Sequence, residues 1–120
     1  MIRPWAEIER FYVDLLPSLP AAPFRDAFAA IRALCSHISD GAHTSVLFGW
    51  TSMHDLCIQQ VDGEPRSGSF LRISPQQDGT VEFSYCDTMI ASRQWSRTVP
   101  AAGIIGQFDA FLDQLHWVAG

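Results

Sequence analysis

The chain contains no lysine and no asparagine, and all eight of its Lys or Arg residues are arginines. The absence of lysine excludes every chemistry that needs its amine: a P-loop lysine on phosphate, a Schiff-base lysine and a lysine general base. The absence of asparagine excludes N-glycosylation. Every fixed positive charge is therefore a planar guanidinium that stays protonated at physiological pH and can donate several hydrogen bonds at once.

Positive charge is also in the minority. Thirteen acidic residues against eight arginines give a formal net charge of −5. Because non-specific binding of nucleic acids comes mostly from neutralising phosphates, we expect no nucleic-acid partner. The stretch after Pro100 carries Asp109 and Asp113 and no arginine, which favours a basic partner there.

Cysteine is sparse and long apolar runs are missing. The three cysteines, Cys35, Cys57 and Cys86, are an odd number without the spacing of a disulfide framework, so a secreted disulfide scaffold is not expected. Glu7 and Glu9 interrupt any signal-peptide segment, and no apolar run reaches the ~20 residues of a membrane span. We therefore expect a cytoplasmic protein that does not contact membranes.

What is present fits one globular domain over residues 1–120, with 48% hydrophobic residues to fill its core. Apolar residues recur at helical spacing over 4–16 and again over 23–40, where Gly41 is expected to form a left-handed C-cap. A third helical stripe runs through 104–118. The sequence thus predicts two N-terminal helices and one C-terminal helix.

Between these helices the pattern is typical of β-strands. Residues that favour strands gather at 44–50, 56–61, 70–74, 80–87 and 94–99. The pair Asp78-Gly79, between two of these stretches, predicts a hairpin. Strands in a run, flanked by helices, predict an α+β fold: an antiparallel meander of four or five strands with the helices packed on one sheet face.

Alternation along the strands predicts what the other sheet face carries. If the helices cover Leu71, Ile73, Val81 and Phe83, the opposite face presents a mixed polar set with Phe70 at its edge. That set is Asp55, Cys57, Gln59, Arg72, Ser74, Glu82, Ser84 and Cys86. Such a face is a candidate surface for a peptide, a shallow ligand or another protein. The alternative is a solvated face on which Arg72 and Glu82 form a cross-strand pair.

The last predicted strand offers a second candidate surface. Arg93, Trp95 and Arg97 alternate onto one face, and two guanidiniums beside an indole suit a carboxylate, a phosphate or a protein hot spot. The alternative is that Trp95 belongs to the core while the arginines pair with Asp87 or Glu82.

Two arrangements bear on thiol and metal chemistry. His54 and Cys57 lie close in sequence, but on a strand they point to opposite faces, and only a helical turn would bring them together. His37 and His43 flank a predicted turn and can converge, yet no second pair completes a tetrahedral metal site. We therefore expect no metal and no cofactor.

These observations favour a binding protein over an enzyme. We expect an inhibitor, an immunity-type protein or an adaptor that contacts another protein, or a second copy of itself, through the open sheet face. The candidate binding residues are Arg72, Glu82, Arg93, Trp95 and Arg97. The alternative is a small-ligand receptor or a thiol-dependent enzyme in which Cys57 or Cys86 acts with His54.

Overall fold

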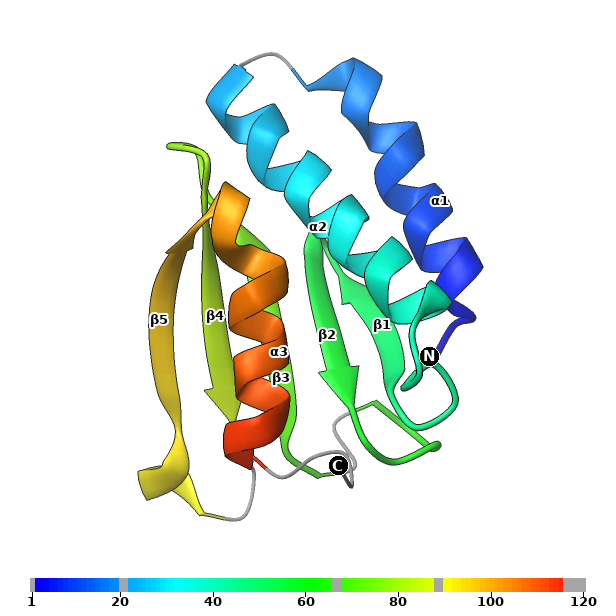
Figure 1. Cartoon of the computed structure of the whole chain (residues 1–120), viewed down its shortest axis with the longest axis vertical. Coiled ribbons are helices and arrows are strands. Elements are labelled where there is room, and N and C mark those ends of the chain that lie inside the picture. The colour runs from blue at the N-terminus through cyan, green and yellow to red at the C-terminus, as the bar shows by residue number, and fades with distance from the viewer. Residues whose placement is uncertain (1, 20–21, 66–67, 88–89, 116–120) are drawn as a thin grey trace.

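The computed structural model describes residues 2–19, 22–65, 68–87 and 90–115. Its two layers are a β-sheet and a set of α-helices that covers one face of the sheet (Figure 1). The α-helices are α1 (Trp5–Leu15), α2 (Ala22–Asp40) and α3 (Ile104–Leu115). The strands are β1 (Phe48–Ser52), β2 (Asp55–Gln59), β3 (Phe70–Pro75), β4 (Thr80–Cys86) and β5 (Trp95–Pro100). Short 3-10 turns are η1 (Leu16–Ser18), η2 (Ala91–Arg93) and η3 (Ala101–Gly103). The predicted α+β fold is confirmed.

The sheet is a meander in which the strands lie in chain order, each antiparallel to the next. The predicted hairpin at Asp78-Gly79 joins β3 to β4. Gly79 has a φ of +91°, which glycine adopts without strain. Asp78 Oδ1 accepts hydrogen bonds from Thr80 N at 3.0 Å and from Thr80 Oγ1 at 2.6 Å. These bonds close the turn.

Each α-helix buries the apolar stripe that its sequence predicts. α1 begins after Pro4, whose extended backbone leads into the first turn. The buried residues of α1 are Trp5, Ile8 and Tyr12; those of α2 are Ala27, Phe28, Ile31, Leu34, Cys35 and Ile38. Those of α3 are Ile104, Phe108, Phe111 and Leu112. In the part of the chain that the structure describes, no helix is both long and apolar enough to cross a membrane.

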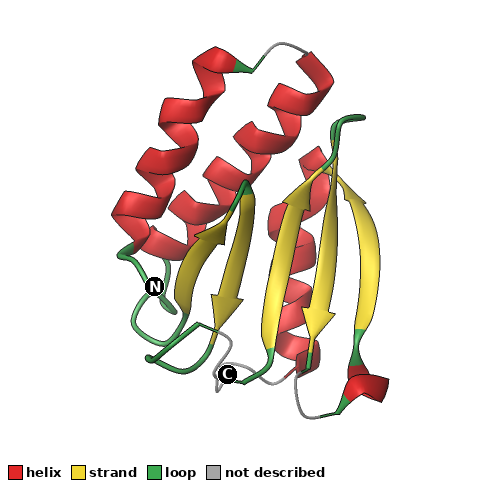
Figure 2. Cartoon of the chain, turned by 180° about the vertical axis from the view of Figure 1, so that it is seen from behind, coloured by secondary structure: helices red, strands yellow, loops and turns green. Residues whose placement is uncertain are grey.

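The helices pack on the sheet face that strand alternation predicts. Leu71, Ile73, Val81 and Phe83 are all completely buried beneath them, within one continuous core. Along β4, buried and half-buried side chains alternate strictly. The opposite sheet face has no described helix over it (Figure 2).

The segment between α2 and β1 differs from the prediction. A strand was expected from residue 44, but the chain first makes a turn in which Val46 N and Leu47 N both bond to His43 O, and β1 starts at Phe48. Trp5 Nε1 donates to Leu47 O at 2.9 Å, which holds this turn against α1. Tertiary packing thus overrides the strand preference of these residues.

Gly41 does not form the expected left-handed C-cap, since the positive φ among the described glycines belongs to Gly79. Glycine is needed at 41 for another reason: a β-carbon there would lie 2.7 Å from His37 O.

The end of β2 also differs from the prediction. β2 stops at Gln59 rather than at 61, because the Gln59 side chain donates to Val61 O at 2.7 Å and to Glu64 O at 3.2 Å and so holds the chain in a turn. The predicted third helix is described as far as Leu115, and its expected end at 118 lies outside the described residues.

Candidate functional site

The sheet face opposite the helices, hereafter the open face, is the largest predicted site. The strand registers place on it Ser52 and Asp55 near one end, followed by Ser74, Glu82 and Thr98 on the next strands. A second row runs Trp50, Cys57, Arg72, Ser84 and Ser96. A third runs Phe48, Gln59, Phe70 and Cys86. The predicted set of side chains therefore does share one face.

An ion pair on the open face joins Asp55 of the first row to Arg72 of the second row. Arg72 Nε donates to Asp55 Oδ2 at 2.6 Å, and the two side chains are only 31% and 20% exposed. The hydrogen bond to Asp55 raises the pKa of Arg72 above its already high ordinary value. The pair thus holds a guanidinium in one position on a sheet face that no described helix covers.

The expected pair between Arg72 and Glu82 does not form. Arg72 lies directly opposite Cys57 and Ser84, so Asp55 and Glu82 are both its diagonal neighbours, one on each side. The guanidinium bonds to Asp55, while Glu82 Oε1 accepts a hydrogen bond from Ser84 Oγ at 3.4 Å. Strand alternation identifies both carboxylates as candidates but does not choose between them.

The other end of the open face is not polar. Trp50, Cys57 and Phe70 form a small buried cluster there, with Ile2 and Cys86 packed against it. The Trp50 and Phe70 ring centroids are 5.4 Å apart. This second core was missed, although the signal was available: both aromatic residues have the strand parity of the open face.

The two predicted binding residues of β5, Trp95 and Arg97, lie on the helix side of the sheet and not on the open face. The Trp95 ring contacts Phe111 of α3 at 4.5 Å, and the Arg97 guanidinium lies 5.7 Å from the Phe111 ring and 5.9 Å from that of Trp95. Trp95 thus packs against the edge of the main core on the helix side of the sheet. Arg93 belongs to η2, so the predicted alternation along one strand holds only for Trp95 and Arg97. The structure does not bring them to Arg72.

The structure also separates the groups of the predicted thiol site. His54 lies in the turn between β1 and β2, and its ring packs against Phe28 on the helix side at 5.4 Å. Cys57 is fully buried in the cluster on the opposite face, and Cys86 is half-buried beside that cluster. His54 therefore meets neither thiol, as strand alternation predicts for Cys57.

His37 and His43, which the sequence allows to converge across the predicted turn, reach the same cavity. Both line a cavity of about 320 Å³ between the end of α2, the loop after it, and α3. Asp109 and Asp113 line the same cavity, and His37 Nε2 lies 3.0 Å from Asp109 Oδ1. The described residues contain no group of three or more His, Cys, Asp or Glu side chains arranged to hold a metal ion.

The fold and these surfaces define an α+β protein whose five-stranded meander is covered by helices on one face only. Comparison of the chain with protein-family models, curated proteins and solved structures found no match. Its function is therefore inferred from its own geometry.

Proposed function

We propose that this protein binds another protein through the polar part of the open face, as an inhibitor, an immunity-type protein or an adaptor does. The observation that carries the proposal is the Asp55–Arg72 pair, which holds a guanidinium in place on a sheet face that no described helix covers. Arginine is enriched at protein interfaces, and a side chain already held in place loses less entropy on binding.

The breadth of the face, which spans all five strands, supports a protein partner over a small molecule. Small ligands bind in concave sites, whereas protein interfaces are broad. Around Arg72 the face carries Glu82 and the hydroxyls of Ser74, Ser84 and Thr98. These groups offer both donors and acceptors, so a partner with complementary polar groups would satisfy them across a broad contact.

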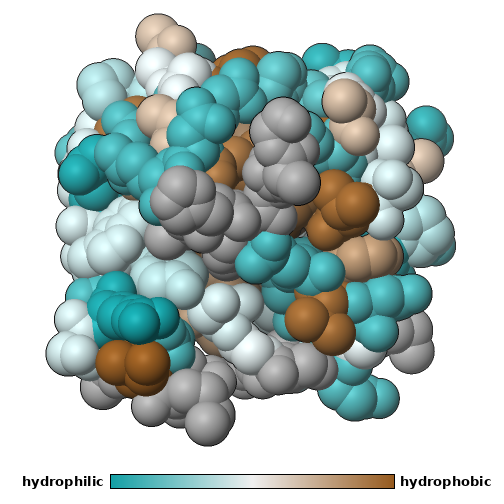
Figure 3. Space-filling view, turned by 60° about the horizontal axis from the view of Figure 1, so that its bottom comes forward, coloured by the Kyte–Doolittle hydropathy of each residue, from teal (hydrophilic) through white to brown (hydrophobic). Residues whose placement is uncertain are grey.

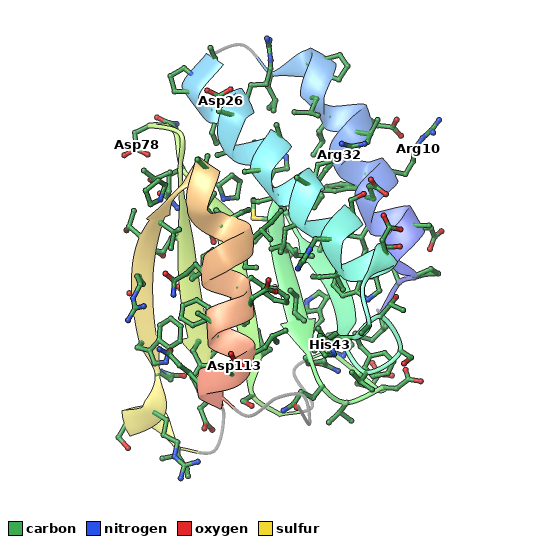
Figure 4. The ribbon with its side chains drawn as sticks, in the orientation of Figure 1. Arg10, Asp26, Arg32, His43, Asp78 and Asp113 are labelled. Carbon is green, nitrogen blue, oxygen red and sulfur yellow. The ribbon has the colours of Figure 1, made fainter. Side chains whose placement is uncertain are left out.

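The test uses the purified chain to capture a partner from extracts of the organism that encodes it, followed by measurement of the Kd. Glu82→Arg should weaken binding at least tenfold, because it reverses a charge within the polar part of the open face. The matched control is Arg10→Ala on the outer side of α1 (Figure 4), which should leave the Kd unchanged. A captured partner that binds Glu82→Arg and Ser84→Arg as tightly as the wild type would show that the open face is not the interface.

A further inference from the structure

The cavity between α2 and α3 combines an apolar floor with acidic walls. Its floor is formed by Ile38, Leu47, Phe108 and Leu112, each 4% exposed or less. Its volume, about 320 Å³, lies at the lower end of the range for small-molecule sites, roughly 300 to 1,000 Å³. Figure 3, which brings this end of the molecule forward, shows polar and apolar residues intermixed on the surface.

The fixed charges that line the cavity have one sign. Asp109 and Asp113 lie four residues apart on α3, and none of the described lining residues is an arginine. Asp109 is occupied by its contact with His37. Asp113, by contrast, receives no hydrogen bond or ion pair from the residues that the structure describes. One carboxylate is thus available to a ligand at the cavity wall.

The backbone adds to the negative potential. α2 ends beside the cavity, where His37, Ile38 and Gly41 contribute to its lining. The carboxyl end of a helix carries a partial negative charge from carbonyls that lack intrahelical partners. The close approach of Gly41 to His37 O keeps the chain tight against this helix end, where a side chain would collide. An anion would therefore be repelled from both α2 and α3.

We propose that this cavity binds a small primary amine that carries an aliphatic or aromatic group. The ammonium group contacts the Asp113 carboxylate, and the apolar group lies on the floor formed by Ile38 and Phe108. His43, in the loop across from Asp113 (Figure 4), lines the remaining wall. This site is separate from the open face and does not depend on the proposed protein partner.

The test uses three probes of nearly equal shape and different charge: 2-phenylethylamine, 2-phenylethanol and 3-phenylpropanoate. Each probe is titrated into the full chain, and binding is monitored by calorimetry and by NMR. The amine should show saturable binding at α2 and α3. The alcohol should bind at least tenfold more weakly, because it lacks the charge, and the carboxylate should not bind.

Variants of the full chain locate the site. Asp113→Asn should weaken amine binding at least fivefold and leave the weak binding of the alcohol unchanged. Ala42→Trp, at an exposed lining position, should remove both by filling the cavity. Asp26→Asn is the matched control, because it removes an exposed carboxylate near the other end of α2 (Figure 4). It should leave the affinities for the amine and for the alcohol unchanged.

Several outcomes would overturn the proposal: equal affinity for the three probes, no saturable binding of the amine, or amine binding that Asp113→Asn leaves intact. Self-association that Ala42→Trp abolishes would mean that a second copy of the chain occupies the cavity instead. None of these results would bear on the open face, because no protein partner is present in the titration.

Discussion

Asp55 and Arg72 show how one residue pair organises the open face. Both are largely withdrawn from solvent, so their attraction is screened less than that of a surface pair. Their hydrogen bond is also charge-assisted, which makes it stronger than a neutral one. The pair therefore contributes to stability as well as holding Arg72 in position, where we propose that a partner protein binds.

A double-mutant cycle measures this contribution. Asp55→Asn, Arg72→Met and the double variant should give a coupling energy of about 1 kcal/mol in urea unfolding. The matched control is the pair Arg10–Asp14 on α1, with side chains 77% and 66% exposed. Its coupling should be about 0.5 kcal/mol or less. Equal coupling in the two pairs would contradict the view that partial burial strengthens the pair on the open face.

The ionisation of Asp78 makes folding stability depend on pH. Its side chain accepts two hydrogen bonds from Thr80, and these lower the pKa of Asp78 below its ordinary value. The ionised carboxylate therefore favours the folded state above the ordinary aspartate pKa of about 3.9, and this effect is lost as the pH falls through the folded pKa. NMR titration should find the depressed pKa in the wild type and a higher one in Thr80→Val. An unchanged Asp78 pKa in that variant would rule out the hydroxyl as its cause.

At the scale of elements, two glycines have opposite roles. Gly79 sits in the β3–β4 turn with a positive φ, and a β-carbon there would lie 3.0 Å from Pro23 O. Gly106 lies within α3, and a β-carbon there would meet nothing within 4 Å. The turn therefore needs its glycine, while the helix is weakened by one.

Alanine substitutions at these two glycines should consequently change the free energy of unfolding in opposite directions. Gly79→Ala should destabilise the protein by about 1 kcal/mol or more, since it strains the backbone and crowds Pro23. Gly106→Ala should stabilise it by about 0.5 to 1 kcal/mol, since it reduces the entropy of the unfolded chain. Thermal and urea unfolding of both variants check this. Two changes of the same sign would contradict the local structures described for the turn and the helix.

At the scale of the whole molecule, the core between α1, α2 and the sheet encloses two groups that must remain neutral. Burial raises the pKa of the Tyr12 hydroxyl and of the Cys35 thiol. Both groups therefore keep their protons in the folded state at pH values where they would lose them in the unfolded chain. The Tyr12 hydroxyl also donates to His54 O at 3.0 Å, which ties α1 to the β1–β2 turn.

Folding stability should accordingly fall in alkali. Below the ordinary pKa values of about 8.5 for cysteine and 10 for tyrosine the stabilisation is complete, and it is lost progressively as the pH rises from there toward the folded values. Urea unfolding between pH 7 and pH 11 measures this. Tyr12→Phe should be less stable at pH 7, because it loses the bond to His54, but should show a weaker alkaline decline. A decline equal to that of the wild type would exclude Tyr12 as a cause.

The same core should protect the thiols. Cys35 and Cys57 are both fully buried, so neither should react with a thiol reagent until the protein unfolds, when all three cysteines should react. Ellman titration with and without guanidinium chloride tests this expectation. Rapid modification of Cys57 in the folded protein would revive the thiol-dependent alternative.

The sequence by itself determined the elements and their faces. Helical spacing predicted the stripes of Ile8 on α1 and Phe28 on α2, and strand alternation predicted that Val81 faces the helices and Glu82 does not. Such patterns are local, because burial on one side of a helix or strand forces a periodic choice of residues.

Only the tertiary structure decided which residues meet across elements. It paired Arg72 with Asp55 rather than Glu82, and it brought His37 of α2 to Asp109 of α3, 72 residues later in the chain. Periodicity gives the face on which a side chain lies, but the partner depends on register, packing and the path of the loops. The packing of the layers decides which of two diagonal carboxylates Arg72 binds. It also forms the cavity between α2 and α3.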